Sequence, residues 1–251
     1  MGELNSFYYM KRVYFVMFLF FTMSIVACET DDIIPVNQEE LIDYSTDPTN
    51  PYQGKKISII SHSRGTYARY IPKGNRSYYP KGDVIDVKLT WWWKLINTLG
   101  ARLEVNESFS AGRVSNTHPT YPSFIDRVSN LGNPDVILFW GGINDQRKKT
   151  PVGTLDFSTP LENLDESKFA SALDKLVRLM FQFYPNAEVI IFIEDKLNDQ
   201  AYIDVLREVA DHYELKTVDL TDLKATTLDG VHYDANGMQQ IVDETLIQLG
   251  I

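Results

Sequence analysis

The chain has 251 residues, of which 44% are hydrophobic and 23% charged, and its formal net charge is −10. This length and composition are typical of one globular domain with ample material for a core. The acidic balance argues against a nucleic-acid partner, because phosphate binding needs clustered Lys and Arg, and the sequence has no basic stripe and no P-loop spacing. Its four histidines are scattered without ligand spacing. We therefore expect neither a metal nor an organic cofactor.

The N-terminal segment has the features of a bacterial export signal. Lys11 and Arg12 precede an apolar run over residues 13–26, which is too short for a comfortable transmembrane helix. The run leads to Cys28, the only cysteine, so no intramolecular disulfide can form. Small residues before a cysteine resemble the lipobox of bacterial lipoproteins, which predicts a signal peptide over residues 1–27 and lipidation of Cys28. The alternative is an ordinary signal peptide or signal anchor with an incidental cysteine.

Residues 28–54 are acidic and rich in turn formers, which predicts a flexible tether between a lipid anchor and a folded domain over residues 55–251. The acidic residues directly after Cys28 resemble the export tags of some surface-displayed lipoproteins. We therefore expect the protein at the bacterial cell envelope, anchored in the outer membrane and exposed at the surface, with the N-terminal lipid as its only membrane contact.

From residue 55 onward, short apolar runs alternate with segments of helical spacing. Strands are predicted over residues 57–60, 103–106, 135–140, 189–193 and 217–220, and helices over residues 91–99, 124–128, 167–183, 200–213 and 236–249. Strands that alternate with helices across short connections favour an α/β fold, a three-layer α/β/α sandwich with a five-stranded, mainly parallel sheet.

Ser63 follows the first of these strands, and open α/β sheets bind ligands just outside the carboxyl ends of their strands. It is the candidate nucleophile, although most serines at strand ends only form turns. The aromatic loop over residues 67–86 is long enough to form a wall or lid beside Ser63, or it packs as a cluster of its own. Of the three consecutive tryptophans at 91–93, at most two can face a ligand, so core packing is expected for most of them.

Four blocks follow one another at the ends of the predicted strands. They are Ser63, an Asn-x-Ser-x-x-x-Gly segment that ends at Gly112, a Gly-Gly-x-Asn-Asp segment with Asn144, and an Asp-Gly-x-His segment that ends at His232. In this order they resemble the SGNH hydrolases, the GDSL esterase/lipase superfamily, over essentially all of residues 55–251. The resemblance implies a flavodoxin-like sandwich and a catalytic serine.

Residue by residue, the resemblance implies Ser63 as nucleophile, His232 as its base and Asp229 as the group that orients His232. A serine hydroxyl is a poor nucleophile until an adjacent, oriented base accepts its proton. The backbone N–H groups of Ser63 and Gly112 and the amide of Asn144 would form the oxyanion hole. Alternatively, Asp229 only forms a turn and His232 is a satisfied loop histidine, or Asn144 only braces its loop.

One block departs from the family pattern, because Ser61 and His62 stand where the family has glycine and aspartate. Ser61 is expected to alter the turn that presents Ser63, and His62 to substitute as a donor, to act as an auxiliary base or to disturb the oxyanion hole. The residues expected to line the substrate cleft are His62, Arg64, Tyr67, His118 and Asp145, with Asp145 more suited to tying down its loop than to reacting.

The sequence thus predicts a serine ester hydrolase that acts through an acyl-enzyme on a small-molecule or glycan ester such as an acetylated carbohydrate. Two alternatives stay open: a short-chain acyl esterase or lysophospholipase acting on lipid, and a catalytically compromised domain that binds a glycan. The sequence does not indicate an oligomeric state.

Overall fold

The computed structural model describes residues 50–251. The predicted signal peptide, Cys28 and most of the predicted tether lie outside the described residues. Within the described range, no helix has the length and apolar character needed to span a membrane.

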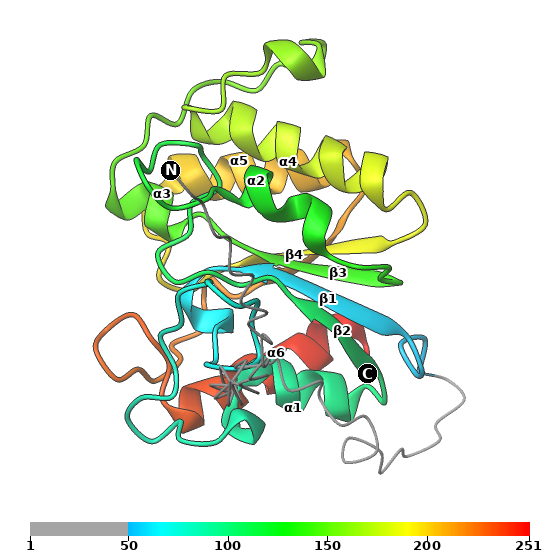
Figure 1. The fold of residues 1–251 in the computed structure, drawn as a ribbon, viewed down its shortest axis with the longest axis vertical. Coiled ribbons are helices and arrows are strands. Elements are labelled where there is room, and N and C mark those ends of the chain that lie inside the picture. The colour runs from blue at the N-terminus through cyan, green and yellow to red at the C-terminus, as the bar shows by residue number, and fades with distance from the viewer. Residues whose placement is uncertain (1–49) are drawn as a thin grey trace, which may run out of the picture. The chain divides into compact units, whose positions relative to one another are not determined.

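Five parallel strands form the central sheet in the order β2-β1-β3-β4-β5 (Figure 1). The strands are β1 (Lys56–Ser61), β2 (Arg102–Asn106), β3 (Val136–Trp140), β4 (Glu188–Ile193) and β5 (Lys216–Asp219). Each lies within about two residues of its predicted range. The chain adds β2 on one side of β1 and β3 on the other, so the switch in strand order lies at the carboxyl ends of β1 and β3.

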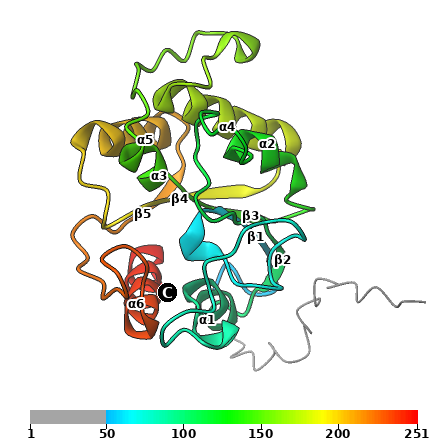
Figure 2. The ribbon, with the colours of Figure 1, turned by 60° about the vertical axis from the view of Figure 1, so that its left-hand side comes forward.

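Helices cover both faces of the sheet (Figures 1 and 2). On one face lie α1 (Trp91–Thr98) and α6 (Ala235–Leu249); on the other lie α2 (Phe124–Arg127), α4 (Phe169–Phe183) and α5 (Gln200–His212). This confirms the predicted three-layer sandwich. The strand order is the flavodoxin-like one.

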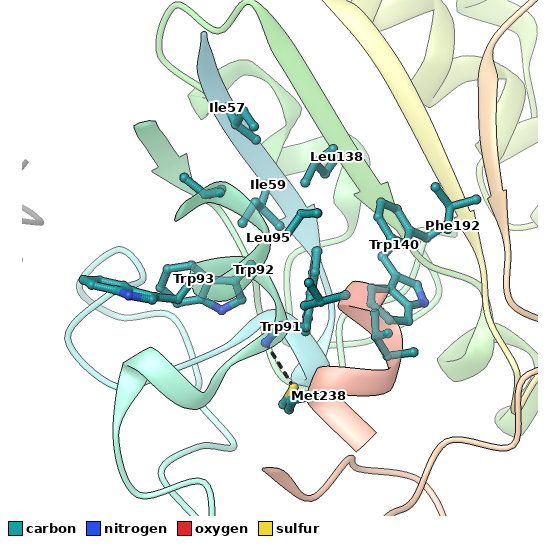
Figure 3. Packing of buried hydrophobic residues seen from close by; sticks show 14 of the residues in the cluster. Ile57, Ile59, Trp91, Trp92, Trp93, Leu95, Leu138, Trp140, Phe192 and Met238 are labelled. Carbon is teal, nitrogen blue, oxygen red and sulfur yellow. Dashed lines mark hydrogen bonds between the residues drawn. The ribbon is translucent and has the colours of Figure 1, made fainter. Parts of the chain in front are cut away.

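Alternate side chains of the central strands enter opposite layers, as the two-residue period of a strand requires. On β1, Ile57 and Ile59 belong to the core beneath α1 (Figure 3). Ile60 belongs to the core beneath α4. The tryptophans of α1 are all buried, as expected, and the ring of Trp91 lies 4.9 Å from that of Trp140 on β3.

Two features differ from the sequence prediction. One α-helix was not predicted: the short helix α3 (Ile143–Arg147) follows β3 directly, and five residues are too few to show helical periodicity. The folded region also extends back at least to Asn50, because Tyr52 is buried in the core and the Asn50 side chain donates to the carbonyl of Leu99 at 2.9 Å. The predicted tether therefore ends earlier than residue 54.

The first-block substitution at Ser61 is accommodated by a glycine four residues later. A Cβ atom at Gly65 would lie only 2.9 Å from the Cβ of Ser61 and 2.5 Å from the Oγ of Ser108. The side chain of Ser61, which is absent from the family pattern, thus takes up space that any side chain at position 65 would need. Glycine at position 65 therefore leaves room for the side chain of Ser61 in the turn after β1.

We predict that Gly65→Ala lowers the free energy of unfolding by about 1–3 kcal/mol, the usual cost of an extra methyl group in a packed site. Urea denaturation measures the loss. In the double variant S61G/G65A the loss should be smaller than the sum of the two single losses, because the Cβ–Cβ contact is gone. Strict additivity of the two single losses would contradict this account.

Candidate active site

The candidate site lies where β1 and β3 end, at the switch in strand order. Ser63 opens a 3-10 turn (Ser63–Gly65) directly after β1, and Asn144 lies in the first turn of α3 after β3. The loop before α6 carries Asp229 and His232. The topology of the sheet therefore gathers residues that are up to 169 positions apart in the chain.

Ser63, His232 and Asp229 form a continuous hydrogen-bonded chain. The Oγ of Ser63 lies 2.8 Å from Nε2 of His232, and Nδ1 of His232 lies 2.8 Å from Oδ2 of Asp229. The other carboxylate oxygen of Asp229 accepts the backbone N–H of His232 at 2.8 Å. With Nδ1–H donated to Asp229, Nε2 of His232 is the lone-pair nitrogen that faces the serine hydroxyl, which is the orientation a general base requires.

Tyr78 fixes this arrangement from the side. Its ring stacks on the imidazole of His232, with centroids 3.4 Å apart and planes inclined by 13°, and its hydroxyl donates to Oδ2 of Asp229 at 2.8 Å. Tyr78 belongs to the aromatic loop over residues 67–86, so this loop forms a wall of the site. Other aromatics of the same loop are buried, among them Tyr67 and Tyr79. Both interpretations of the loop thus hold for different residues.

The surroundings lower the pKa values of both His232 and Asp229. Burial lowers the pKa of His232 to about 4, although the adjacent Asp229 carboxylate favours the protonated form. Burial alone would raise the pKa of Asp229, but hydrogen bonds from His232 and Tyr78 outweigh it and hold that pKa well below its usual range. At neutral pH the pair therefore consists of an ionised aspartate and a neutral imidazole.

The predicted oxyanion donors are arranged differently from the expectation. The backbone N–H of Gly112 donates to the carbonyl of Phe109 at 2.9 Å, so it is already engaged within its own turn. Asn144 donates one amide hydrogen to the carbonyl of Gly112 at 2.8 Å, which orients the amide and leaves its second hydrogen for a ligand. The remaining donor is the N–H of Ser63, at the first position of its turn, where helices leave amides unpaired.

Gly112 is a glycine for a packing reason rather than to keep an oxygen site open. A Cβ atom there would lie 2.9 Å from the carbonyl oxygen of Phe109, 3.0 Å from the ring of Phe124 and 3.1 Å from the guanidinium of Arg127. Any side chain at position 112 would therefore collide with these neighbouring residues.

A pocket of about 400 Å³ opens beside the serine. Most of its lining is polar or charged. It is lined by Ser63, Arg76, Tyr78, Ser110, Ala111, Ile143, Asn144, Arg147, Lys148, Val231 and His232.

None of the five residues expected in the cleft is among those that line this pocket. His62, Arg64 and Asp145 are buried, because their side chains turn inward from the strand ends. Tyr67 is buried too, and its hydroxyl donates to the carbonyl of Ile85 at 2.7 Å. His118 is half-buried and stacks on Tyr121, with ring centroids 4.0 Å apart.

Asp145 braces the loop, as the sequence suggested. Its carboxylate accepts the backbone N–H groups of Val114 at 2.9 Å and Ser115 at 3.0 Å, and the hydroxyl of Ser115. Burial raises the pKa of Asp145 to about 6, against the opposing effect of these hydrogen bonds. The brace ties the segment after Gly112 to α3.

His62 and Arg64 belong to a buried ion-pair network with Glu194 and Asp195, which follow β4. The guanidinium of Arg64 pairs with Glu194 and lies 3.4 Å from Asp195, and Nε2 of His62 lies 3.4 Å from Glu194. Burial alone would raise the pKa of Glu194, but Arg64 and His62 outweigh it, and that pKa lies below its ordinary value. The contacts of the buried His62 ring are to Glu194 and to the N–H of Arg64, which is a structural role in the turn after β1.

Sequence reasoning missed three classes of site residue. Tyr78 belongs to the aromatic loop that was expected as a wall, but the sequence does not show which tyrosine of that loop contacts the histidine. Arg147 and Lys148 carry no sequence signal because they end a helix that is itself too short to predict. Glu194 looks like any polar residue after a strand until its burial is known.

Comparisons with known proteins agree with this architecture. The family model described as GDSL-like lipase/acylhydrolase matches residues 55–249. A protein from Bacteroides ovatus whose structure is described as that of a GDSL-like lipase is 30% identical, with a TM-score of 0.72 over 79% of this chain and 99% of that one. A similarly described protein from Bacteroides uniformis is also 30% identical, with a TM-score of 0.70 over 78% of this chain and 96% of that one.

A family two carbohydrate esterase from Clostridium thermocellum, solved in complex with cellohexaose, shares 16% identity and a TM-score of 0.56 over 78% of this chain and 65% of that one. At that identity the likeness concerns the fold alone. No curated protein matches the chain significantly.

The fold and the Ser–His–Asp arrangement are those of serine-dependent ester hydrolases. The chain belongs to the GDSL-like lipase/acylhydrolase family, within the SGNH superfamily, and is a carboxylic ester hydrolase.

The lowered pKa of His232 sets the expected pH profile. A general base acts only when neutral, so kcat/KM for a neutral ester should fall as the pH drops through about 4 and should be flat from about pH 6 to 8. Initial rates with p-nitrophenyl acetate across this range, corrected for spontaneous hydrolysis, measure the acid limb. A midpoint near the ordinary histidine value of about 6.5 would contradict the assignment.

Two variants of Tyr78 separate burial from hydrogen bonding. Tyr78→Ala uncovers one face of the imidazole and should move the midpoint from about 4 towards 6, because burial is the main cause of the shift. Tyr78→Phe keeps the stacked ring and loses only the hydroxyl bond to Asp229, so its midpoint should stay nearer to that of the parent. Equal midpoints in all three proteins would show that the ring does not set this pKa.

Proposed function

We propose that this ester hydrolase removes short acyl groups, chiefly acetyl, from carbohydrate at the cell envelope through an acyl-enzyme formed on Ser63. The observation that carries the proposal is the chain of 2.8 Å contacts from Ser63 through His232 to Asp229. Ser63 and His232 both line the pocket.

Each step of the reaction has a group in place. Ser63 Oγ attacks the ester carbonyl while its proton passes to Nε2 of His232, and the carbonyl oxygen takes the negative charge. The N–H of Ser63 and the free amide hydrogen of Asn144 are the donors for that oxygen. The intermediate then expels the alcohol, which receives the proton from His232. Water, deprotonated by the same nitrogen, releases the acid and restores the serine.

The pocket favours a short acyl group on a polar alcohol over a lipid. In the part of the chain that the structure describes, its only apolar lining residues are Ala111, Ile143 and Val231. A long acyl chain needs a continuous apolar channel, because sites for apolar ligands are lined mainly by hydrophobic side chains. The shared fold with carbohydrate esterases is compatible with a sugar ester and supports it only at the level of architecture.

The geometry after β1 gives little support to the hypothesis of a catalytically compromised, glycan-binding domain. It was motivated by Ser61 and His62, yet the turn after β1 still presents the Ser63 hydroxyl to His232 at 2.8 Å. Gly65 makes room for Ser61, and the imidazole of His62 is buried against Glu194.

We predict hydrolysis of p-nitrophenyl acetate by residues 29–251, with kcat/KM falling steeply from acetate to butyrate to octanoate. Ser63→Ala and His232→Ala should each reduce kcat by at least about a thousandfold, because the two groups act as a unit. Circular dichroism of each variant controls for folding.

Turnover that survives Ser63→Ala would remove the serine as nucleophile. A preference for octanoate would favour the lipid alternative over a sugar ester. Absence of turnover with every ester, together with binding of a glycan, would favour the binding domain.

The envelope location is a separate part of the proposal and is supported by the residues before the described range. Full-length protein expressed in a bacterium should incorporate labelled palmitate, and Cys28→Ser should abolish the label while leaving the esterase activity unchanged. Protease treatment of intact cells then tests surface display. Label retained in Cys28→Ser, or complete protection from protease, would contradict the anchor or the display respectively.

A further inference from the structure

The mouth of the pocket is strongly cationic although the protein as a whole is acidic. Of residues 50–251, Arg76, Arg147 and Lys148 line the pocket, and no aspartate or glutamate of this range does. The formal net charge of the whole chain is −10. The charge at this one place is therefore opposite in sign to the balance of the molecule.

These cations have no carboxylate partner among residues 50–251. Arg76 donates to the hydroxyl of Tyr121 at 3.0 Å, and its guanidinium lies 5.6 Å from that ring. Arg147 and Lys148 are exposed, side by side at the end of α3, and their side chains make no ion pair within the described range. Some other basic residues of the same range are paired, as Lys175 is with Glu166.

A second observation points to the same positive region. Next to the pocket, the pKa of the His118 imidazole is lowered by burial and then by the positive charges of Arg113, Lys148 and Arg76. Three basic residues thus lie close enough to act on one imidazole. Unpaired cations beside a reactive serine raise the local concentration of anions and hold them in place.

We infer that the substrate carries a negative charge, a carboxylate or a sulphate, near its scissile ester, and that Arg147 and Lys148 are the residues that select it. This inference rests on the proposed esterase function and narrows its substrate to acidic esters, such as acetylated acidic glycans. A guanidinium presents two parallel N–H donors to a carboxylate or sulphate, and the lysine amine beside it adds a point charge. Ala111, Ile143 and Val231 are left to face the acyl group.

Three small esters that differ in charge test the selection. They are 4-acetoxybenzoate, 4-acetoxybenzenesulfonate and the neutral methyl 4-acetoxybenzoate, with acetate release as the readout. The first two distinguish carboxylate from sulphate. The ratio of kcat/KM for an anionic ester to that for the neutral ester is compared between proteins, so that intrinsic differences in leaving group cancel.

In the double variant R147Q/K148Q this ratio should fall by about tenfold relative to the parent, the effect of two partly screened charges at contact distance. The matched control is K55Q/R102Q, which removes the same net charge from exposed positions at the amino ends of β1 and β2. Its ratio should equal that of the parent. Circular dichroism confirms that both variants are folded.

Salt provides a second measurement on the unaltered protein. Raising the ionic strength from about 0.01 M to about 1 M shortens the Debye length from ~30 Å to ~3 Å. KM for 4-acetoxybenzoate should rise accordingly, whereas KM for the methyl ester should not. Acetylated polygalacturonate and its methyl-esterified form extend the same comparison to glycans.

An unchanged ratio in R147Q/K148Q, or an equal fall in the control, would overturn the selection by these two residues. Hydrolysis of all three esters without preference would overturn the inference and leave the esterase function standing. Failure of the parent protein to hydrolyse any of the three esters or p-nitrophenyl acetate would instead overturn the esterase function, and the inference with it.

Discussion

The site depends on one buried cation, the guanidinium of Arg64. It pairs with the carboxylate of Glu194 and donates to the hydroxyl of Tyr233 at 2.7 Å. Both members of the ion pair are fully buried, and a buried charge left without its partner costs roughly 3–5 kcal/mol. The chain segments that supply these partners therefore cannot separate without a large penalty.

The position of the ion pair matters because it is connected to the sequence neighbours of all three reacting groups. Arg64 follows Ser63, and Tyr233 follows His232. Glu194 accepts the backbone N–H of Ile143, the residue before Asn144, at 3.1 Å. Nucleophile, base and amide donor are each one residue from the same buried charge network. The loops that carry these groups are thus held in place by buried contacts, where solvent does not compete.

This network also explains why the departure from the family pattern is tolerated. His62 points into the interior, with Nε2 3.4 Å from Glu194, and its Nδ1 accepts the N–H of Arg64 at 3.4 Å. An aspartate at that position would bring a second carboxylate against Glu194 in a region that water does not reach, where like charges repel strongly. Position 62 therefore belongs with Glu194 and Arg64 rather than with the substrate.

How much of this could be predicted from sequence depends on the physical signal. Strands and long helices carry periodicity, so the layers and the order of the site blocks were predictable, and Ser63, Asp229 and His232 do meet. Which way a side chain turns after a strand ends has no periodic signal. His62 and Arg64 were expected in the cleft but turn inward, towards Glu194. This could not be predicted, because Glu194 lies more than a hundred residues away in the sequence.

The basic residues around the site thus fall into two groups, one buried and one exposed to solvent. In the interior, the charge of Arg64 is neutralised by Glu194. This pair holds the chain segments together, because burial makes an unpaired charge costly. Around the pocket, Arg147 and Lys148 remain solvated and unpaired among the described residues, so they add little to stability and are available to a ligand. These cations lie only a few residues along the chain from the oxyanion donor Asn144. They give the entrance of the pocket a preference for anionic substrates although the protein is acidic. The buried pair fixes where the ester must lie, and the exposed pair determines what charge may accompany it.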